Sequence, residues 1–235
     1  MIDARTKTKS LYWFGGLACM ILILYSIITM LIMIILGSPP ETIEKCFSML
    51  NQNRLNGLLR LDILTVFVMP LYYLLFYSIY QALRKSNQEV VSLSTIIIFA
   101  GLTLFLATPS VFSLLHLSDK YALASTDIEK SQLLAAGQAI IASDMWHGTG
   151  ARIGGILLQL GALLISIIML KSKVFNKLTA ITGIVTHGLD FLHIIIGFFL
   201  PTIGVILMAV AGPLYLLWFP LIGVRLFRLN IQNNA

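Results

Sequence analysis

Six long apolar runs constrain the fold of this chain more than any other feature of its sequence. They cover residues 11–36, 61–83, 91–117, 148–170, 178–200 and 202–224, and each is long enough for the ~20 helical residues that cross a bilayer. The composition agrees, since 58% of the residues are hydrophobic and only 11% are charged, whereas soluble domains have about 25% charged residues. The sequence therefore predicts an all-α polytopic membrane protein, in which residues 1–235 form a single domain of six transmembrane helices.

The distribution of lysine and arginine predicts the orientation of these spans, because cytoplasmic loops are enriched in both residues. One side of the predicted membrane collects ten of them: Arg5, Lys7, Lys9, Arg84, Lys85, Lys171, Lys173, Lys177, Arg225 and Arg228. The other side has six, spread over much longer loops: Lys45, Arg54, Arg60, Lys120, Lys130 and Arg152. We expect an integral protein of the cell membrane with both termini in the cytoplasm. The net charge of +6 then indicates membrane lipids as partners, and not nucleic acid.

Two long outer loops, residues 37–60 and 118–147, carry signals for short helices. Ser38 followed by Glu41 has the pattern of a capping box, with Pro39 at the first helical position. Thr126 and Glu129 repeat that pattern before an apolar stretch. We expect each loop to contain a short helix that lies on the outer surface with its apolar face toward the membrane.

Small residues and prolines predict how the spans pack. Gly150, Gly154 and Gly161 share one side of the fourth span, where small residues let helix backbones approach closely in lipid. Pro70, Pro109 and Pro213 interrupt the second, third and sixth spans, so we expect kinks there.

Ionisable and polar side chains inside the spans are the main candidates for a functional site, because such groups are costly in a membrane. In the predicted topology they fall at the midplane or in its outer half. The resulting pocket candidates are Asp62, Tyr73, Arg152, Gln159, His187, Asp190 and His193. On the fifth span the two histidines flank Asp190 within an arc of roughly 120°. One pocket can therefore receive all three side chains.

Arg152 is the expected charge partner of Asp190 or Asp62, because a buried charge needs such a partner. Simpler interpretations also hold for individual residues. Asp62 at the end of a span is equally expected to lie in the interfacial region. His187 is expected to be a neutral histidine bonded to a neighbouring helix.

A metal site is a second hypothesis, since four histidines and several carboxylates are available. The candidate ligands are His116, His147, His187, Asp190 and His193. His187 and His193 are six residues apart, whereas a helix favours a spacing of three or four residues for shared ligation. We therefore predict no cofactor, with zinc or a bis-histidine haem as the alternatives.

One family resemblance covers most of the chain, from about Leu55 to Leu229. Its main residues are "HGTGARIGGILLQLGALLISIIMLKSKVFNKLTAITGI", with "LLRLDILTVFVMPLYYLLFYSIYQALR" before them and "GPLYLLWFPLIGVRL" after them. This order of segments resembles a family of uncharacterised six-span prokaryotic membrane proteins, a domain of unknown function. The resemblance implies six helices and assigns neither an activity nor a catalytic residue.

A weaker likeness connects the chain to the membrane hydrolases that include the alkaline ceramidases. It consists of Ser113 and His116 on one span and Asp62 on another, and it implies a zinc-dependent lipid hydrolase. That family has Ser-x3-His and a late His-x3-His, whereas this chain has Ser-x2-His and His-x5-His.

Three functions follow as hypotheses. The first is a membrane protein without an assigned activity that binds a small or lipid-like amphiphilic ligand in an outward-facing polar pocket. The second is a zinc-dependent lipid hydrolase. The third is a transporter coupled to protons or ions, with Asp190 and His187 as the relay.

Overall fold

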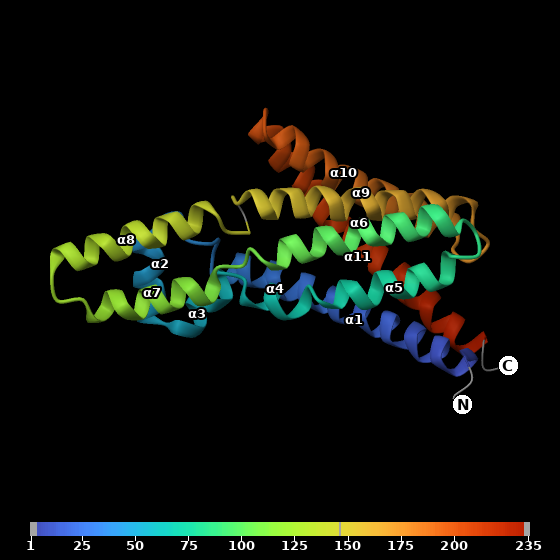
Figure 1. Cartoon of the computed structure of the whole chain (residues 1–235), viewed down its shortest axis with the longest axis horizontal. Coiled ribbons are helices and arrows are strands. Elements are labelled where there is room, and N and C mark those ends of the chain that lie inside the picture. Colours follow the sequence, from blue (N-terminus) through green and yellow to red (C-terminus); the bar gives the residue numbers. More distant parts are fainter. Residues whose placement is uncertain (1–3, 146, 233–235) are drawn as a thin grey trace. The chain divides into compact units, whose positions relative to one another are not determined.

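The computed structural model describes residues 4–145 and 147–232. Every regular element in this part of the chain is a helix, as predicted (Figure 1). The helices are α1 (Ala4–Ile35), α2 (Ile43–Gln52), α3 (Arg54–Arg60), α4 (Ile63–Val68), α5 (Leu71–Leu83), α6 (Gln88–Leu106), α7 (Val111–Leu123), α8 (Asp127–Ala142), α9 (Thr149–Lys171), α10 (Lys177–Gly197) and α11 (Pro201–Gln232).

Six segments of the described chain are long and apolar enough to cross a membrane: Ser10–Ile35, Ile63–Leu83, Gln88–Leu123, Thr149–Lys171, Lys177–Gly197 and Pro201–Gln232. Each of them overlaps one of the six predicted spans. The prediction of a six-span helical membrane protein is therefore confirmed.

The contacts between residues divide the chain into two compact units. The first unit holds the described residues up to Leu24, Pro70–Thr103 and those from Ile153 onward. The second unit holds Tyr25–Met69 and Leu104–Arg152. The pocket candidates Tyr73, Gln159, His187, Asp190 and His193 thus share the first unit, whereas Asp62 and Arg152 belong to the second.

The first unit is held together by apolar helix faces and small residues. Helices α10 and α11 pack along each other, and the side chains of Trp218, Phe219 and Phe76 are fully buried. A Cβ added at Gly161 of α9 would lie 2.7 Å from the backbone oxygen of Ser94 on α6, so no larger residue fits there. Gly161 of the fourth span therefore serves close helix packing, as predicted.

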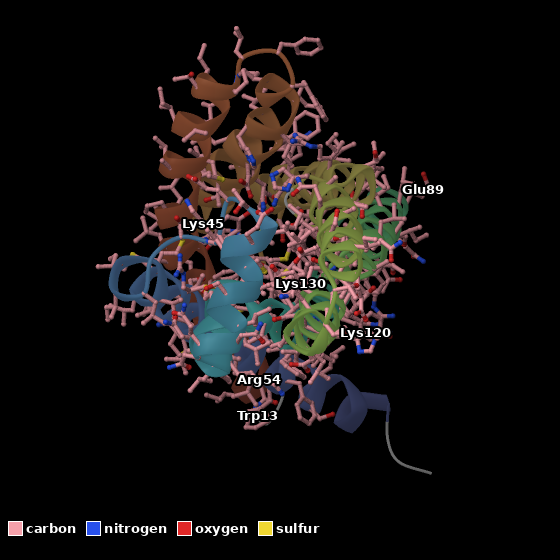
Figure 2. All side chains as sticks on the ribbon, turned by 90° about the vertical axis from the view of Figure 1, so that its left-hand side faces the viewer. Trp13, Lys45, Arg54, Glu89, Lys120 and Lys130 are labelled. Atoms are coloured by element: carbon pink, nitrogen blue, oxygen red, sulfur yellow. The ribbon has the colours of Figure 1, made fainter. Side chains whose placement is uncertain are left out.

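The second unit contains the helices of both long loops. Its core consists of Ile43, Cys46, Phe47, Leu50 and Leu114, from α2 and α7. The basic side chains of Lys45 on α2, Arg54 on α3 and Lys120 on α7 are exposed (Figure 2). Because other helices cover the apolar face of α2, the expectation that this face lies against the membrane is wrong.

Helix α7 continues six residues past the expected end of the third span and includes Ser118, Asp119 and Lys120. Packing within the second unit explains the difference. The Ser118 hydroxyl is buried and donates to the backbone oxygen of Phe47 at 3.3 Å. The Asp119 carboxylate accepts a hydrogen bond from Arg54. Partners on α2 and α3 thus satisfy polar groups that would otherwise favour the end of a span.

One of the two predicted helix starts is confirmed. Thr126 is the N-cap of α8 and accepts from the backbone N–H of Glu129 at 3.2 Å. The other start is wrong, because α2 begins after Thr42, whose hydroxyl accepts from the backbone N–H of Lys45. Ser38 and Pro39 precede the helix, since Thr42 offers its own capping hydroxyl closer to the apolar run.

The prolines act differently in different spans. Pro70 separates α4 from α5, and Pro109 lies between α6 and α7. Helix α11 runs without a break through both Pro213 and Pro220. The predicted interruptions therefore occur at Pro70 and Pro109, whereas at Pro213 the helix continues.

Candidate functional site

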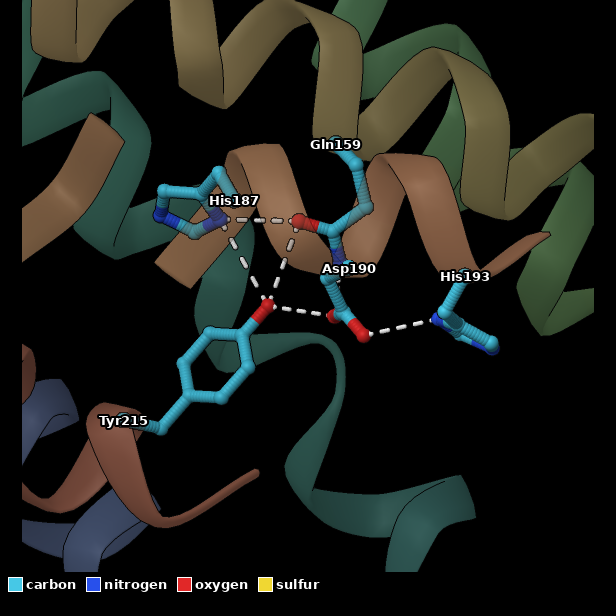
Figure 3. A network of polar contacts seen from close by, with 5 residues as sticks. All are labelled: Gln159, His187, Asp190, His193 and Tyr215. Atoms are coloured by element: carbon cyan, nitrogen blue, oxygen red, sulfur yellow. Dashed lines mark hydrogen bonds and ion pairs between the residues drawn. The ribbon is translucent and has the colours of Figure 1, made fainter. Parts of the chain in front are cut away.

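Three spans of the first unit bring five polar side chains together. Helix α10 supplies His187, Asp190 and His193, α9 supplies Gln159, and α11 supplies Tyr215 (Figure 3). Spacings of three residues place the α10 side chains along one side of that helix. Four of the seven predicted pocket candidates, Gln159, His187, Asp190 and His193, are thus in mutual contact, whereas the bonds described for this network do not involve Asp62, Tyr73 or Arg152.

The Asp190 carboxylate is the centre of this network. Its Oδ2 accepts hydrogen bonds from Tyr215 Oη and from Gln159 Nε2, each at 2.7 Å. Its Oδ1 lies 3.0 Å from Nδ1 of His193, and the Asp190 side chain is only 16% exposed. The carboxylate is therefore surrounded by two neutral donors and one titratable imidazole.

His187 joins the network from the other side of Gln159. Its Nδ1 lies 2.8 Å from Gln159 Oε1, and the residue is 1% exposed. Because the amide nitrogen of Gln159 donates to Asp190, the amide oxygen is left to accept from His187. The neutral imidazole therefore carries its proton on Nδ1 and a bare lone pair on Nε2.

Two aromatic rings pack against the imidazole of His187. The imidazole stands edge-on to the indole of Trp218, with ring centroids 4.6 Å apart at 89°. It also meets the ring of Tyr215 at 5.5 Å. Neither Nε2 of His187 nor Nε1 of Trp218 has a hydrogen-bond partner in the described part of the chain. Each of these two contacting rings thus holds one buried nitrogen without a hydrogen-bond partner among the described residues.

The sequence prediction missed Tyr215 and named Tyr73 instead. Tyr73 Oη forms a hydrogen bond of 2.6 Å with Thr103 Oγ1 and contacts the ring of Phe99. None of the bonds within the Asp190 network involves it. The available signal for Tyr215 was its spacing of three from Trp218 in "LYLLW". That spacing places a hydroxyl and an indole N–H on neighbouring positions of one apolar helix.

Asp62 lies in the second unit and forms a separate cluster. It adopts a left-handed backbone conformation with φ 55° and ψ 49° between α3 and α4. Its Oδ2 accepts from Tyr25 Oη at 2.9 Å and from Thr65 Oγ1. Thr65 is buried. The Asp62 carboxylate therefore lies among hydroxyl groups, at the point where the second span is interrupted between α3 and α4.

The remaining candidates also lie in the second unit. Arg152 occupies the first turn of α9, and its expected role as a charge partner stays a prediction. His116 is exposed on α7. His147 lies 3.0 Å from Asp144 through Nδ1 and Oδ1, and its backbone N–H donates to the same oxygen.

Asp144 and His147 border a cavity of about 270 Å³ within the second unit. Its wall is mostly apolar and includes Leu61, Val111, Leu114 and Met145. Glu41 also lines the cavity, and titratable groups beside an apolar wall suit a small amphiphilic molecule.

No three histidine, cysteine, aspartate or glutamate side chains converge on a common point in residues 4–145 and 147–232. His187, for example, directs Nδ1 to Gln159 rather than to the carboxylate of Asp190. Cys19 and Cys46 are both buried and free. The histidine-rich zinc arrangement therefore has no preformed ligand set among these residues.

Comparison with known proteins agrees with the resemblance found in the sequence. The family described as "Domain of unknown function (DUF4386)" matches residues 14–223. The chain belongs to this family. No curated protein and no solved structure matches it. Membership of the DUF4386 family agrees with the six-helix architecture and assigns no activity to Asp190 or to its neighbours.

Proposed function

We propose that this protein is a proton-coupled membrane carrier in which Asp190 takes up and releases the proton. The observation that supports the proposal is the setting of the Asp190 carboxylate. It lies within a span, and its described contacts are Gln159, Tyr215 and His193. An acidic group inside a span is a common element of proton relays.

The charge of the Asp190–His193 pair changes with each proton. With one shared proton the pair is neutral as a whole, either as carboxylate and imidazolium or as carboxylic acid and imidazole. Loss or gain of a proton leaves a net charge inside an apolar helix bundle, where charges are costly. Protonation thus changes the free energy of burying the network, which is what couples a proton to a change between two conformations.

Gln159 extends this change to His187. When Asp190 is ionised, its Oδ2 accepts from Gln159 Nε2, and Gln159 Oε1 accepts from His187 Nδ1. When Asp190 carries a proton on the same oxygen, it donates, so the amide of Gln159 turns over. His187 then accepts at Nδ1 and moves its own proton to Nε2, beside Trp218. The proton state of Asp190 is thereby transmitted to the buried end of the network.

The sequence prediction gives this proposal a direction. The lysine and arginine distribution favours cytoplasmic termini in the cell membrane, which puts the Asp190 network at the midplane or in its outer half. His193, at 26% exposure of its side chain, is then the more accessible end of the relay, and His187 is the enclosed end.

Infrared difference spectroscopy of the purified protein tests the proton site directly. Acidification protonates the exposed carboxylates as well, so the diagnostic signal is a separate component of the C=O band, at the higher frequency of a carboxylic acid shielded from water, that is present in wild type and absent in Asp190→Asn. Asp119→Asn is the matched control, because Asp119 forms an exposed ion pair with Arg54 and should leave the band unchanged. If the shielded component persists unchanged in Asp190→Asn, the proposal is overturned.

Transport is tested in liposomes that contain a fluorescent pH indicator and hold a pH gradient. Small amines, amino acids and organic anions are added one at a time. At least one compound should accelerate proton movement with wild type and Asp119→Asn, and not with Asp190→Asn. Proton movement at the same rate in Asp190→Asn would remove Asp190 from the mechanism.

Binding of a small amphiphilic ligand in the second unit is a second candidate function, supported by the cavity beside Asp144 and His147. Leu114→Trp places a larger side chain in the wall of this cavity. Mass spectrometry of the wild-type protein purified in mild detergent should find a bound molecule that Leu114→Trp lacks. An equal yield of the same molecule from the variant would exclude this cavity as its site.

A further inference from the structure

A second groove, of about 500 Å³, lies within the first unit and is independent of the Asp190 network. It is formed by the turn between α9 and α10 together with the last turns of α11. Its polar lining includes Lys173, Asn176, Thr179, Arg225 and Arg228. The groove therefore combines three basic side chains from two segments that are far apart in the sequence.

The charge of this groove has one sign, since no aspartate or glutamate lines it. Arg225 is held in place because its Nε donates to the backbone oxygen of Val174. Its terminal guanidinium nitrogens remain as further donors. Lys173 and Arg228 are exposed, and neither has an ion-pair partner among the residues that the structure describes. A fixed arginine with two unpaired cations beside it is suited to an anion with several acceptor oxygens.

The N-terminus of α10 adds to the positive charge of this groove. Asn176 caps the helix by accepting from the backbone N–H and the hydroxyl of Thr179, at 2.8 and 2.7 Å. The first turn of this 21-residue helix carries a partial positive charge, which favours anions. The backbone of α10 and the basic side chains therefore both favour a negatively charged ligand.

The groove also has an apolar lining, made by Val174, Phe175, Pro220, Leu221 and Val224. A free inorganic anion gains nothing from these side chains, whereas the glycerol and first acyl carbons of a lipid would be buried against them. The ends of α9, α10 and α11 that form the groove are also ends of three candidate spans. A headgroup in the membrane interface is therefore within reach of the groove.

From this geometry we propose that the groove binds the phosphate headgroup of an anionic phospholipid. Arg225 and Arg228 contact the phosphate oxygens, Lys173 adds positive charge, and the apolar lining receives the glycerol end of the chains. Basic pockets between spans bind anionic headgroups in this way.

Native mass spectrometry of the whole protein, titrated with phosphatidylglycerol and with phosphatidylcholine, tests the proposal. Wild type should bind phosphatidylglycerol in preference to phosphatidylcholine. Lys173→Gln combined with Arg228→Gln should weaken phosphatidylglycerol binding about tenfold or more, since each basic residue near a membrane surface contributes about 1 kcal/mol. Both residues are exposed, so the variant should keep the thermal unfolding temperature of wild type.

Arg84→Gln combined with Lys85→Gln is the matched control, because it removes the same charge from exposed residues outside the groove lining. This control should bind phosphatidylglycerol as wild type does. An equal loss in both double variants would reduce the effect to net charge and overturn the site. Equal affinity for the two lipids would also overturn it. If inorganic phosphate competes completely with phosphatidylglycerol, the ligand of the groove is a free anion and the lipid proposal is wrong.

Discussion

Gln159 donates a hydrogen bond of 2.7 Å from its amide nitrogen to Oδ2 of Asp190, and this bond joins α9 to α10 inside the first unit. The same amide accepts from His187 at 2.8 Å through its oxygen. One neutral side chain therefore sets the orientation of two titratable ones. The consequences can be measured by changing either partner.

Replacing Gln159 by Leu should destabilise the protein by about 1 kcal/mol, within the range found for polar contacts between membrane helices. The variant keeps a similar volume but leaves Asp190 and His187 without this partner. Thermal unfolding in detergent of Gln159→Leu, Asp190→Leu and the double variant gives the coupling energy. Strictly additive effects would show that the two side chains do not interact.

The second prediction concerns the tautomer of His187. Since Gln159 Oε1 is an acceptor, the imidazole should carry its proton on Nδ1 and a lone pair on Nε2 at neutral pH. Nitrogen NMR of protein labelled at histidine distinguishes the two tautomers, and His187→Gln assigns the signal. In Gln159→Leu the preference for Nδ1 should weaken. A wild-type signal typical of a proton on Nε2 at every pH measured would contradict the arrangement of the network.

The third prediction separates two roles of Asp62. The left-handed backbone at this residue costs roughly 1–2 kcal/mol for most side chains, and less for aspartate and asparagine. Asp62→Ala should therefore unfold at a lower temperature than Asp62→Asn, whose amide oxygen can still accept from Tyr25 and Thr65. Asp62→Gly adopts the left-handed backbone without this cost, but like Asp62→Ala it lacks the side-chain oxygen that accepts from Tyr25 and Thr65. If Asp62→Gly and Asp62→Ala unfold at the same temperature, the backbone contribution is absent.

The fourth prediction concerns the thiol of Cys46, which lies outside the spans. Burial raises the pKa of this thiol to about 11, above the value of about 8.5–9 for an exposed cysteine. In a Cys19→Ala background, iodoacetamide at pH 8.5 should label Cys46 in the folded protein about a hundredfold more slowly than in the unfolded protein.

The same shift predicts a change of stability with pH. A raised pKa in the folded state means that Cys46 contributes stability below the unfolded pKa, and that this contribution is lost as the pH rises from about 9 to about 11. Cys46→Ala should remove that part of the pH dependence. Labelling of the folded thiol as fast as of the unfolded one would show that Cys46 is accessible.

The predicted parts of the structure are those that follow from local pattern. The apolar runs predicted six spans, and Thr126 with Glu129 predicted the start of α8. Spacings of three residues predicted that His187, Asp190 and His193 share one side of α10. The site prediction was less complete, because Tyr215 looks like any other aromatic residue of an apolar span. Only the packing of α11 against α10 brings its hydroxyl within 2.7 Å of Asp190.

The sequence by itself determined the class of the protein, the number of spans and the side chains that are costly to bury, because these depend on residue type and spacing along one helix. Only the tertiary structure decided which partners satisfy those side chains. It joined Asp190 to Gln159, Tyr215 and His193, and Asp62 to Tyr25 and Thr65. It also turned the apolar face of α2 toward α7. The physical reason is that hydrogen bonds and packing between helices depend on the relative positions of residues far apart in the chain, which periodicity within a single segment does not specify.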